Sequence, residues 1–269
     1  MALLPCHTSR LIREDPLAVF DETMSPDDHM LTADLASYFQ TARQGLTCVL
    51  DGLAAAGRSP ESISTVLDFG SGYGRIYRAL AAGFPQAQLT ACDLMEPAAR
   101  FCAETFGGDW ARSSEVLDEI RLPRTYDLIW LGSVFTHLPA HRWVSLLDFL
   151  ARATNAGGIV IFTTHGATAI EHIENRILAR NPHMIAAERF AAMKRTLQLT
   201  GFDFIPNKPA AIRHQNDRGI KVSEGEYGFS FASEEWVARL VDRLPPWRLV
   251  KYAAPGWGRN HDAATIVRA

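Results

Sequence analysis

Short apolar runs alternate with amphipathic stretches through the middle of this chain, and the alternation predicts its fold. Runs typical of buried strands lie at residues 65–69, 88–94, 126–131 and 159–162. Apolar residues recur at helical spacing after each run, and Gly83 ends the first such stretch. Four or five strand–helix repeats in succession predict a doubly wound α/β fold.

The first part of the chain has a different pattern. Residues 1–24 show no periodicity and are predicted to be a poorly ordered lead-in. Ser25-Pro26 has the form of a helix start, with Ser as N-cap and Pro in the first turn, and apolar residues continue at helical spacing until Gly57. We expect residues 1–58 to be an N-terminal helical lead-in or cap, which covers either the ligand cleft or only one edge of the sheet.

Residues 166–225 interrupt the strand–helix alternation. Two helical stripes are separated by Asn181-Pro182, and a polar segment follows at 207–225. The pattern predicts a helical insertion and then a loop, within a ligand-binding domain that spans residues 59–269. Insertions at the carboxyl ends of strands often build substrate pockets, although a dimerisation arm, and hence a homodimer, is the alternative.

The end of the chain returns to core-like sequence. Residues 227–231 form an extended run, and Ser233 has the form of a helix start. Two further apolar runs, at 247–252 and 263–267, are predicted to form an antiparallel hairpin at one edge of the sheet.

The first predicted strand ends in a glycine-rich turn. Gly70, Gly72 and Gly74 occupy alternate positions, and Asp68 lies two residues before the first of them. Glycines let the backbone turn tightly and let a ligand approach the main chain, although such turns also occur as plain strand–helix connections. A dinucleotide site usually has the spacing G-x-G-x-x-G, whereas here the spacing is G-x-G-x-G and a buried carboxylate would repel pyrophosphate. The combination suits a ligand with an ammonium group and no phosphate, and S-adenosylmethionine (SAM) is such a ligand.

Polar and aromatic residues follow the next two predicted strands. Asp93 lies 23 positions after Gly70, close to the spacing of roughly 20 at which an acid binds ribose hydroxyls, but a helix N-cap is the alternative role. Trp110 could stack near adenine, with Ser113 or Ser114 hydrogen-bonded to it. Equally, Trp110 could be a core residue and either serine a helix cap.

Composition and charge narrow the function classes. The chain has 269 residues, 47% hydrophobic and 21% charged, with a net charge of −3, so neither a nucleic-acid nor an acidic-membrane partner is indicated. Four cysteines include no C-x-x-C pair, and no set of clustered acids predicts a metal. No apolar run reaches the roughly 18 residues of a membrane span. The apolar run before Pro5 is too short for a signal peptide, and we expect a cytoplasmic protein.

Four motifs together resemble class I SAM-dependent methyltransferases, which have a Rossmann-like fold. The motifs are V-L-D-F-G-S-G-Y-G at 66–74, A-C-D-L at 91–94, Y-D-L-I-W-L-G-S-V-F-T-H-L at 126–138 and N-A-G-G-I-V-I-F-T-T-H-G at 155–166. The resemblance covers roughly residues 60–166 and implies a mostly parallel seven-stranded sheet whose last strand is antiparallel. It leaves 1–58 and 166–225 without a family counterpart that names a substrate.

The resemblance also implies roles for individual residues. Asp68 and the glycine turn would hold the methionine moiety, Asp93 and Leu94 would bind ribose and flank adenine, and Ser133 and Val134 would lie under the methionine end. The predicted cofactor-binding residues are therefore Asp68, Gly70, Ser71, Gly72, Tyr73, Gly74, Asp93, Leu94, Trp110, Ser113, Ser133 and Val134.

Methyl transfer to a hydroxyl also needs a base of near-neutral pKa. His137 and His165 follow predicted strands on the ligand side, and His261 and Asp262 lie in the terminal hairpin turn. We predict His137 and His165 as the catalytic candidates, although a histidine at a strand end often only satisfies backbone groups.

These observations predict a SAM-dependent methyltransferase that acts on an oxygen of a small molecule or a glycan. Similarity of the 126–166 segment to bacterial methyltransferases of surface polysaccharides favours a sugar hydroxyl, and aromatic residues in the closing segments could stack on the acceptor. Those aromatic residues are Tyr227, Phe229, Trp236 and Trp257. The alternatives are a SAM-binding protein without turnover and an NAD(P)-dependent oxidoreductase.

Overall fold

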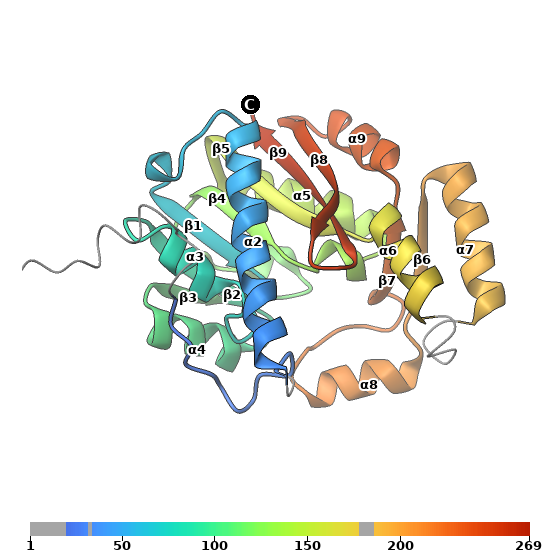
Figure 1. The fold of residues 1–269 in the computed structure, drawn as a ribbon, viewed down its shortest axis with the longest axis horizontal. Helices are drawn as coiled ribbons and strands as arrows, with labels where there is room; N and C mark the ends of the chain where they lie inside the picture. The colour runs from blue at the N-terminus through green and yellow to red at the C-terminus, as the bar shows by residue number, and fades with distance from the viewer. Residues whose placement is uncertain (1–19, 32–33, 178–185) are drawn as a thin grey trace, which may run out of the picture.

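The computed structural model describes residues 20–31, 34–177 and 186–269, and its centre is a seven-stranded sheet (Figure 1). The strands are ordered β3-β2-β1-β4-β5-β9-β8. Their bounds are β1 Thr65–Phe69, β2 Gln88–Asp93, β3 Asp109–Arg112, β4 Tyr126–Leu131, β5 Thr154–Thr164, β8 Trp247–Trp257 and β9 His261–Arg268. Strands β1 to β5 are parallel, while β9 is antiparallel to both β5 and β8. The predicted doubly wound, mostly parallel sheet with an antiparallel last strand is confirmed.

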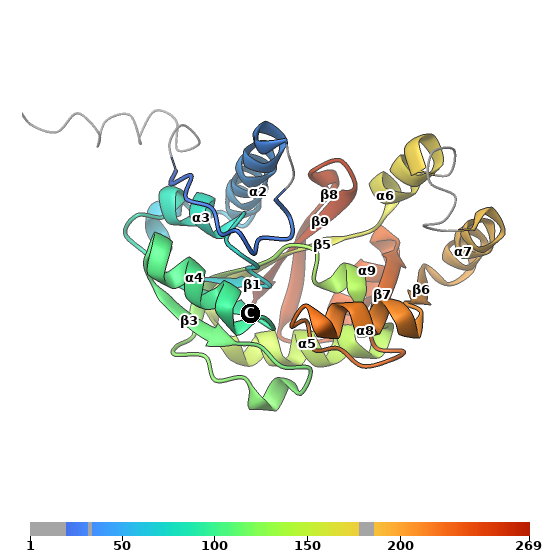
Figure 2. The same cartoon turned by 90° about the horizontal axis from the view of Figure 1, so that it is seen from below.

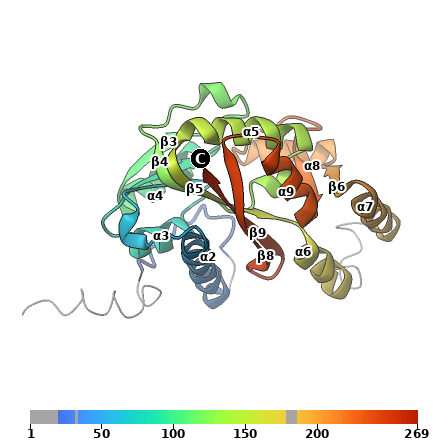
Figure 3. The same cartoon turned by 90° about the horizontal axis from the view of Figure 1, so that it is seen from above.

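Helices cover both faces of the sheet (Figures 2 and 3). The helices of the sheet region are α2 Leu35–Ala55, α3 Tyr77–Gly83, α4 Glu96–Phe106, α5 Ala140–Ala153 and α9 Glu234–Asp242. Buried residues of α2, α3 and α4 form one core cluster with alternate residues of the central strands, such as Val66 and Leu128. Those of α5 and α9 form a second cluster with Leu67 and Ile129 on the opposite face. The alternation within each strand explains why these strands are apolar on both sides.

The predicted start of the N-terminal helix is wrong. Residues 25–30 form turns, and one continuous helix, α2, begins at Leu35 with the side chain of Asp34 accepting a hydrogen bond from Ser37 N. The reason is local competition for backbone groups, because Ser25, the predicted N-cap, accepts a hydrogen bond from Asp27 N, and Asp28 accepts from Met30 N and from the Tyr38 hydroxyl, which stabilises turns in place of a helix. Residues 1–19 of the predicted lead-in lie outside the described residues.

The segment predicted as an insertion is richer in structure than expected. It contains α6 Ala167–His172, α7 Ala187–Thr200, β6 Phe202–Pro206 and α8 Pro209–Asp217, and β7 Gly228–Ala232 pairs with β6 as a separate two-stranded sheet. The predicted break at Asn181-Pro182 lies outside the described residues. The expected loop at 207–225 is wrong in part, because α8 begins with Pro209 and buries only Ile212. A helix with one buried residue has almost no apolar periodicity to detect.

The remaining structural findings concern the domain division and the cysteines. Helix α2 shares one core with the strands, and the division at residue 58 stays a prediction. Within the described ranges, no helix is long and apolar enough to cross a membrane. Cys48, Cys92 and Cys102 are buried free thiols, while Cys6 lies outside the described residues.

Arg78 on α3 connects the segment before α2 to the glycine turn through hydrogen bonds. Its side chain is almost fully buried and donates hydrogen bonds to the carbonyl oxygens of Gly74 (3.0 Å), Asp21 (2.9 Å) and Thr23 (2.9 Å). The guanidinium also lies 4.6 Å from the centroid of the Phe106 ring. One buried cation therefore holds two segments that are far apart in the sequence.

Substitution of Arg78 by Met tests this role. Loss of three hydrogen bonds from a buried charge should lower the free energy of unfolding by about 2–3 kcal/mol, and amide exchange of residues 21–24 should accelerate. Chemical denaturation and hydrogen exchange measure the two effects. Arg100→Met is the matched control, because Arg100 is about half exposed, with a surface ion pair to Glu96 one turn away and the Trp110 ring beside it. Equal stability of the two variants would contradict the assignment.

Candidate cofactor and acceptor site

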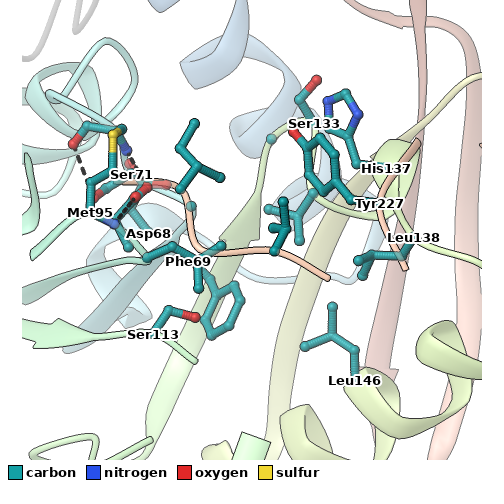
Figure 4. A pocket seen from close by; sticks show the side chains of 18 of the residues that line it. Asp68, Phe69, Ser71, Met95, Ser113, Ser133, His137, Leu138, Leu146 and Tyr227 are labelled. Carbon is teal, nitrogen blue, oxygen red and sulfur yellow. Dashed lines mark hydrogen bonds between the residues drawn. The ribbon is translucent and has the colours of Figure 1, made fainter. Parts of the chain in front are cut away.

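A cavity of about 370 Å³ lies beyond the carboxyl ends of the central strands. This is the edge where open α/β sheets bind ligands, and the volume is in the range of small-molecule pockets. Figure 4 shows Asp68 and Ser71 at one end of the cavity, with Ser133, His137 and Tyr227 at the other. The wall includes every residue of the glycine turn from Gly70 to Tyr73, and Asp93, Leu94, Ser113, Ser133 and Val134. The structure thus brings together most of the residues predicted to bind the cofactor.

The glycine turn has the backbone conformation that its sequence predicts. Gly70, Gly72 and Gly74 have φ values of +86°, +50° and +86°, which lie in the left-handed region that disfavours other residues. A Cβ atom on Gly70 would lie 2.6 Å from Val134 Cγ2. The turn therefore requires glycine at Gly70 both for its φ and for the close approach of Val134. Gly74 packs against α4 and does not line the cavity.

Asp68 is a buried carboxyl group with an unsatisfied oxygen. Its Oδ2 atom has no hydrogen-bond partner among the residues that the structure describes. Burial, reinforced by the charge of Asp93, raises the pKa of Asp68 to about 8. The carboxyl is therefore mostly neutral at pH 7 when no cation is nearby, and ionising it at that pH would cost about 1.4 kcal/mol. A ligand ammonium is the group that would satisfy both the charge and the free oxygen.

Asp93 connects the two strand ends that form this end of the cavity. Its carboxylate accepts hydrogen bonds from Gly72 N and Met95 N, both at 2.8 Å. Burial raises the pKa of Asp93, while these backbone hydrogen bonds lower it. The Met95 bond is of the local capping kind that we considered as the alternative. Each carboxylate oxygen keeps a second lone pair, so a ribose contact remains compatible and stays a prediction.

The structure does not bring Trp110 to the cavity. Trp110 on β3 is 38% exposed and does not line the wall, and the guanidinium of Arg100 lies 4.8 Å from its ring centroid. Side chains alternate along a strand, so Trp110 and Ser113, three residues later, face different surroundings. Ser113 is buried in the cavity wall and donates its N–H to the Asp93 carbonyl at 2.8 Å.

Ser133 enters the cavity from the end of β4 in a strained conformation. Its φ of +64° is the one positive value among the described non-glycine residues. Ser133 N donates to Thr163 Oγ1 at 2.8 Å, and Ser133 Oγ lies 3.0 Å from His261 Nε2. Burial lowers the pKa of His261 to about 3, so this ring is neutral at pH 7. The neutral ring of His261 therefore forms a hydrogen bond with Ser133. The next residue, Val134, lines the cavity beside Gly70.

His137 lies in the wall with one ring nitrogen fixed. It belongs to the helical turn Phe135–His137, and its Nδ1 lies 2.8 Å from the carbonyl oxygen of Gly228. A carbonyl only accepts, so Nδ1 carries the hydrogen and Nε2 carries the lone pair. The Tyr227 ring stacks on the imidazole at 4.8 Å. Burial lowers the pKa of His137, so the ring is neutral at physiological pH.

His165, the other predicted catalytic residue, does not reach the cavity. It is buried behind the wall, with its ring 5.1 Å from that of His261 and 5.6 Å from that of Phe231 on β7. Its Nδ1 has no partner within the described part of the chain, and burial, with the two neighbouring histidines, lowers its pKa well below the usual value. The side chains of β7 cover the end of β5, which the sequence pattern did not predict.

Several wall residues come from segments whose roles the sequence did not predict. Arg75 follows the glycine turn, and Arg142 on α5 forms an ion pair with Glu226. Of the aromatic candidates, Tyr227 and Trp257 line the cavity. The other two do not: Trp236 packs on Phe202 with ring centroids 4.4 Å apart, and Phe229 packs against the histidines.

The comparison with protein families matches the part of the chain that holds most of the predicted site residues. A family model described as a methyltransferase domain matches residues 67–160. Residues 67–160 are therefore similar to a methyltransferase domain. The match confirms the predicted resemblance to methyltransferases over this part of the chain. The match contains the glycine turn, Asp93 and the Ser133–His137 segment.

Other comparisons give a fold likeness at low sequence identity. No curated protein matches the chain. Among solved structures, an O-methyltransferase family protein from Burkholderia thailandensis is 14% identical, with 88% of this chain and 60% of that chain covered at a TM-score of 0.45. Human N-acetylserotonin methyltransferase in complex with SAM is 13% identical, with coverage of 91% and 60% and a TM-score of 0.48.

A third solved structure has nearly the length of this chain. The N-methyltransferase NodS from Bradyrhizobium japonicum, in complex with S-adenosylhomocysteine (SAH), is 13% identical, with coverage of 98% and 99% and a TM-score of 0.47. The chain spans only 50 to 60% of the length of the first five solved structures it matches. Likenesses at this level say nothing about the acceptor of the methyltransferase domain.

Substitution of Gly70 by Ala should impair ligand binding to the methyltransferase domain. The added Cβ is strained at positive φ and pushes Val134, so affinity for SAH should fall about tenfold or more in a calorimetric titration. Gly157→Ala is the matched control, because Gly157 has a φ of +72° and open space around it. The control should lose similar backbone stability without losing SAH affinity. Unchanged SAH affinity in Gly70→Ala would contradict the placement of the ligand at this turn.

Ionisation of Asp68 should make SAH binding dependent on pH. The ligand ammonium favours the charged carboxylate, so binding releases a proton, and affinity should rise up to about tenfold per pH unit from pH 5.5 to 7.5. Titrations in buffers of different ionisation enthalpy measure the affinity and the proton released. 5′-Methylthioadenosine lacks the ammonium and should show a much smaller pH dependence. Asp68→Asn should remove the difference between the ligands, and persistence of that difference in the variant would refute this role.

Proposed function

We propose that the protein is a SAM-dependent methyltransferase whose acceptor atom is a hydroxyl oxygen of a small molecule or a glycan. SAM supplies an activated methyl group on a sulfonium, and the enzyme must align the acceptor and exclude water. A hydroxyl loses its proton as the new carbon–oxygen bond forms, so an oxygen acceptor benefits from a positioned base. The observation that carries the proposal is the base that the cavity wall contains.

His137 has the three properties that a general base needs here. Its side chain lines the cavity, its pKa is lowered so that it is unprotonated at physiological pH, and its Nδ1–H is held by Gly228 O. The hydrogen bond to Gly228 fixes the tautomer in which Nε2 accepts the proton. Tyr227 stacks on the ring and limits its rotation. Of the two predicted histidines, only His137 is in the wall, so we assign the role of base to it.

The wall around His137 indicates the kind of acceptor. It is mainly apolar, with one polar pair formed by Arg142 and Glu226. Apolar side chains that line the same cavity include Leu138, Leu146, Ile220, Val222 and Tyr227. Such a wall suits a compact acceptor that has an apolar or ring face beside its hydroxyl. A small molecule or a sugar ring presents such a face.

His137→Gln tests the proposal directly. Purified protein with methyl-labelled SAM is screened against hydroxylated small molecules and saccharides, and the product of the best acceptor is located by mass spectrometry. Loss of a positioned base should reduce kcat about 10²–10⁴-fold, while SAH affinity stays within about twofold. His165→Gln is the matched control and should retain most of the wild-type kcat, because His165 lies outside the cavity wall.

The pH profile adds an independent readout. Because the pKa of His137 is lowered, the acidic limb of kcat should lie below pH 6.5 and disappear in His137→Gln. Transfer to a nitrogen or carbon atom would overturn the oxygen assignment. Binding of SAH without transfer to any acceptor would favour the alternative of a SAM-binding protein without turnover.

A further inference from the structure

Arg75 is a cation in the cavity wall that forms no ion pair with the residues that the structure describes. It directly follows the glycine turn, and its guanidinium lies 5.6 Å from the Trp257 ring centroid and 5.9 Å from that of Tyr38. The described residues provide Arg75 with neither an ion pair nor a hydrogen bond to its side chain. Burial lowers the pKa of Arg75, which reflects a charge held largely away from water. The aromatic rings hold the guanidinium in place without neutralising it.

Apart from Asp68, the other charged groups that the structure describes in this wall already have polar partners. Arg142 pairs with Glu226, and both carboxylate oxygens of Glu115 accept hydrogen bonds from Ser223. Asp28 is the acid whose charge acts on Arg75, but its oxygens accept from the Tyr38 hydroxyl at 2.6 Å and from Met30 N at 2.9 Å. Arg75 is thus the unpaired positive charge of the cavity within the described ranges.

An anion at this position would remove an energetic cost. A partly buried charge without a counter-ion is unfavourable, and the planar guanidinium fork matches the two oxygens of a carboxylate. Lysine would offer only a point charge there. The chemistry that best completes the wall beside Arg75 is therefore a carboxylate from a bound ligand.

Arg75 lies near His261, whose Nε2 is 3.0 Å from Ser133 Oγ. Its positive charge helps to lower the pKa of His261, whose ring is 5.0 Å from that of Trp257.

We propose that Arg75 binds a carboxylate of a ligand seated in this cavity. The proposal rests on the proposed function for the ligands concerned, because the cofactor carries a carboxylate on its amino-acid end and an acid acceptor would carry another. The two sources share one chemistry and are separated by the following experiments.

The first experiment measures the cofactor's carboxylate. Wild type, Arg75→Gln and Arg75→Lys are titrated calorimetrically with SAH, with decarboxylated SAH and with 5′-methylthioadenosine, which lacks the amino-acid portion. If the cofactor is the source, Arg75→Gln should weaken SAH binding about 10- to 100-fold, with Arg75→Lys intermediate. Binding of the two ligands without a carboxylate should stay within about twofold, which also shows that the variant site is folded.

The second experiment measures a separate carboxylate. Protein saturated with SAH is titrated with benzoate, and with benzamide as its uncharged match. If the acceptor is the source, benzoate should bind more tightly than benzamide to wild type, and Arg75→Gln should abolish that preference while SAH affinity is unchanged. Loss of the preference in the variant supports the proposal with the acceptor as the source.

The proposal and the proposed function fail in different ways. If Arg75→Gln changes neither the preference for SAH over its decarboxylated analogue nor that for benzoate over benzamide, Arg75 binds no carboxylate and the proposal is overturned. If wild type binds neither SAH nor 5′-methylthioadenosine, the cofactor assignment fails first, and the proposed function with it.

Discussion

The burial of two carboxyl groups beneath a single glycine turn is the constraint on which this site depends. Asp93 at the end of β2 accepts Gly72 N–H and so fixes the turn that follows β1. Asp68, one strand over, is left with an oxygen that no described residue satisfies. Two acids this close disfavour each other's charge, and the turn cannot relax without leaving backbone N–H groups unpaired. The fold therefore keeps a buried carboxyl group whose ionised form is favoured only when a cation binds beside it.

Much of the fold was predictable because it depends on local periodicity. Strands buried on both faces are continuous apolar runs, and β1, β2, β4 and β5 were all recognised on that basis. The turn residues were recognised because positive φ requires glycine at Gly70 and Gly72. What the pattern missed has weak periodicity, as in α8 with Ile212 as its single buried residue. The start of α2 was misplaced because Asp28 bonds to its own turn and to Tyr38 rather than to a helix end.

The residues of the candidate site were predictable from the sequence only where the residue type and its spacing indicate one chemical role. Asp68 and the glycine turn meet that condition. His137 and His165 do not, since each follows a strand and the sequence treats them alike. They differ because β7 lies over His165 and provides the carbonyl of Gly228 to His137, which is a contact across 91 residues. Arg75 was also missed, because an unpaired charge is recognised only when the positions of all neighbouring acids are known.

The wall of the cavity is built from two kinds of structure. One end is formed by strand ends whose register is shared by the whole sheet. The other includes residues 220–227, which are attached to the rest of the wall through side-chain bonds such as those of Glu115 and Arg142. Substitutions in 220–227 do not alter the register of the sheet, so their effects on stability are expected to be small. Sequence changes in residues 220–227 can therefore alter the shape of that part of the wall during evolution. The strand ends that form the other part stay in place.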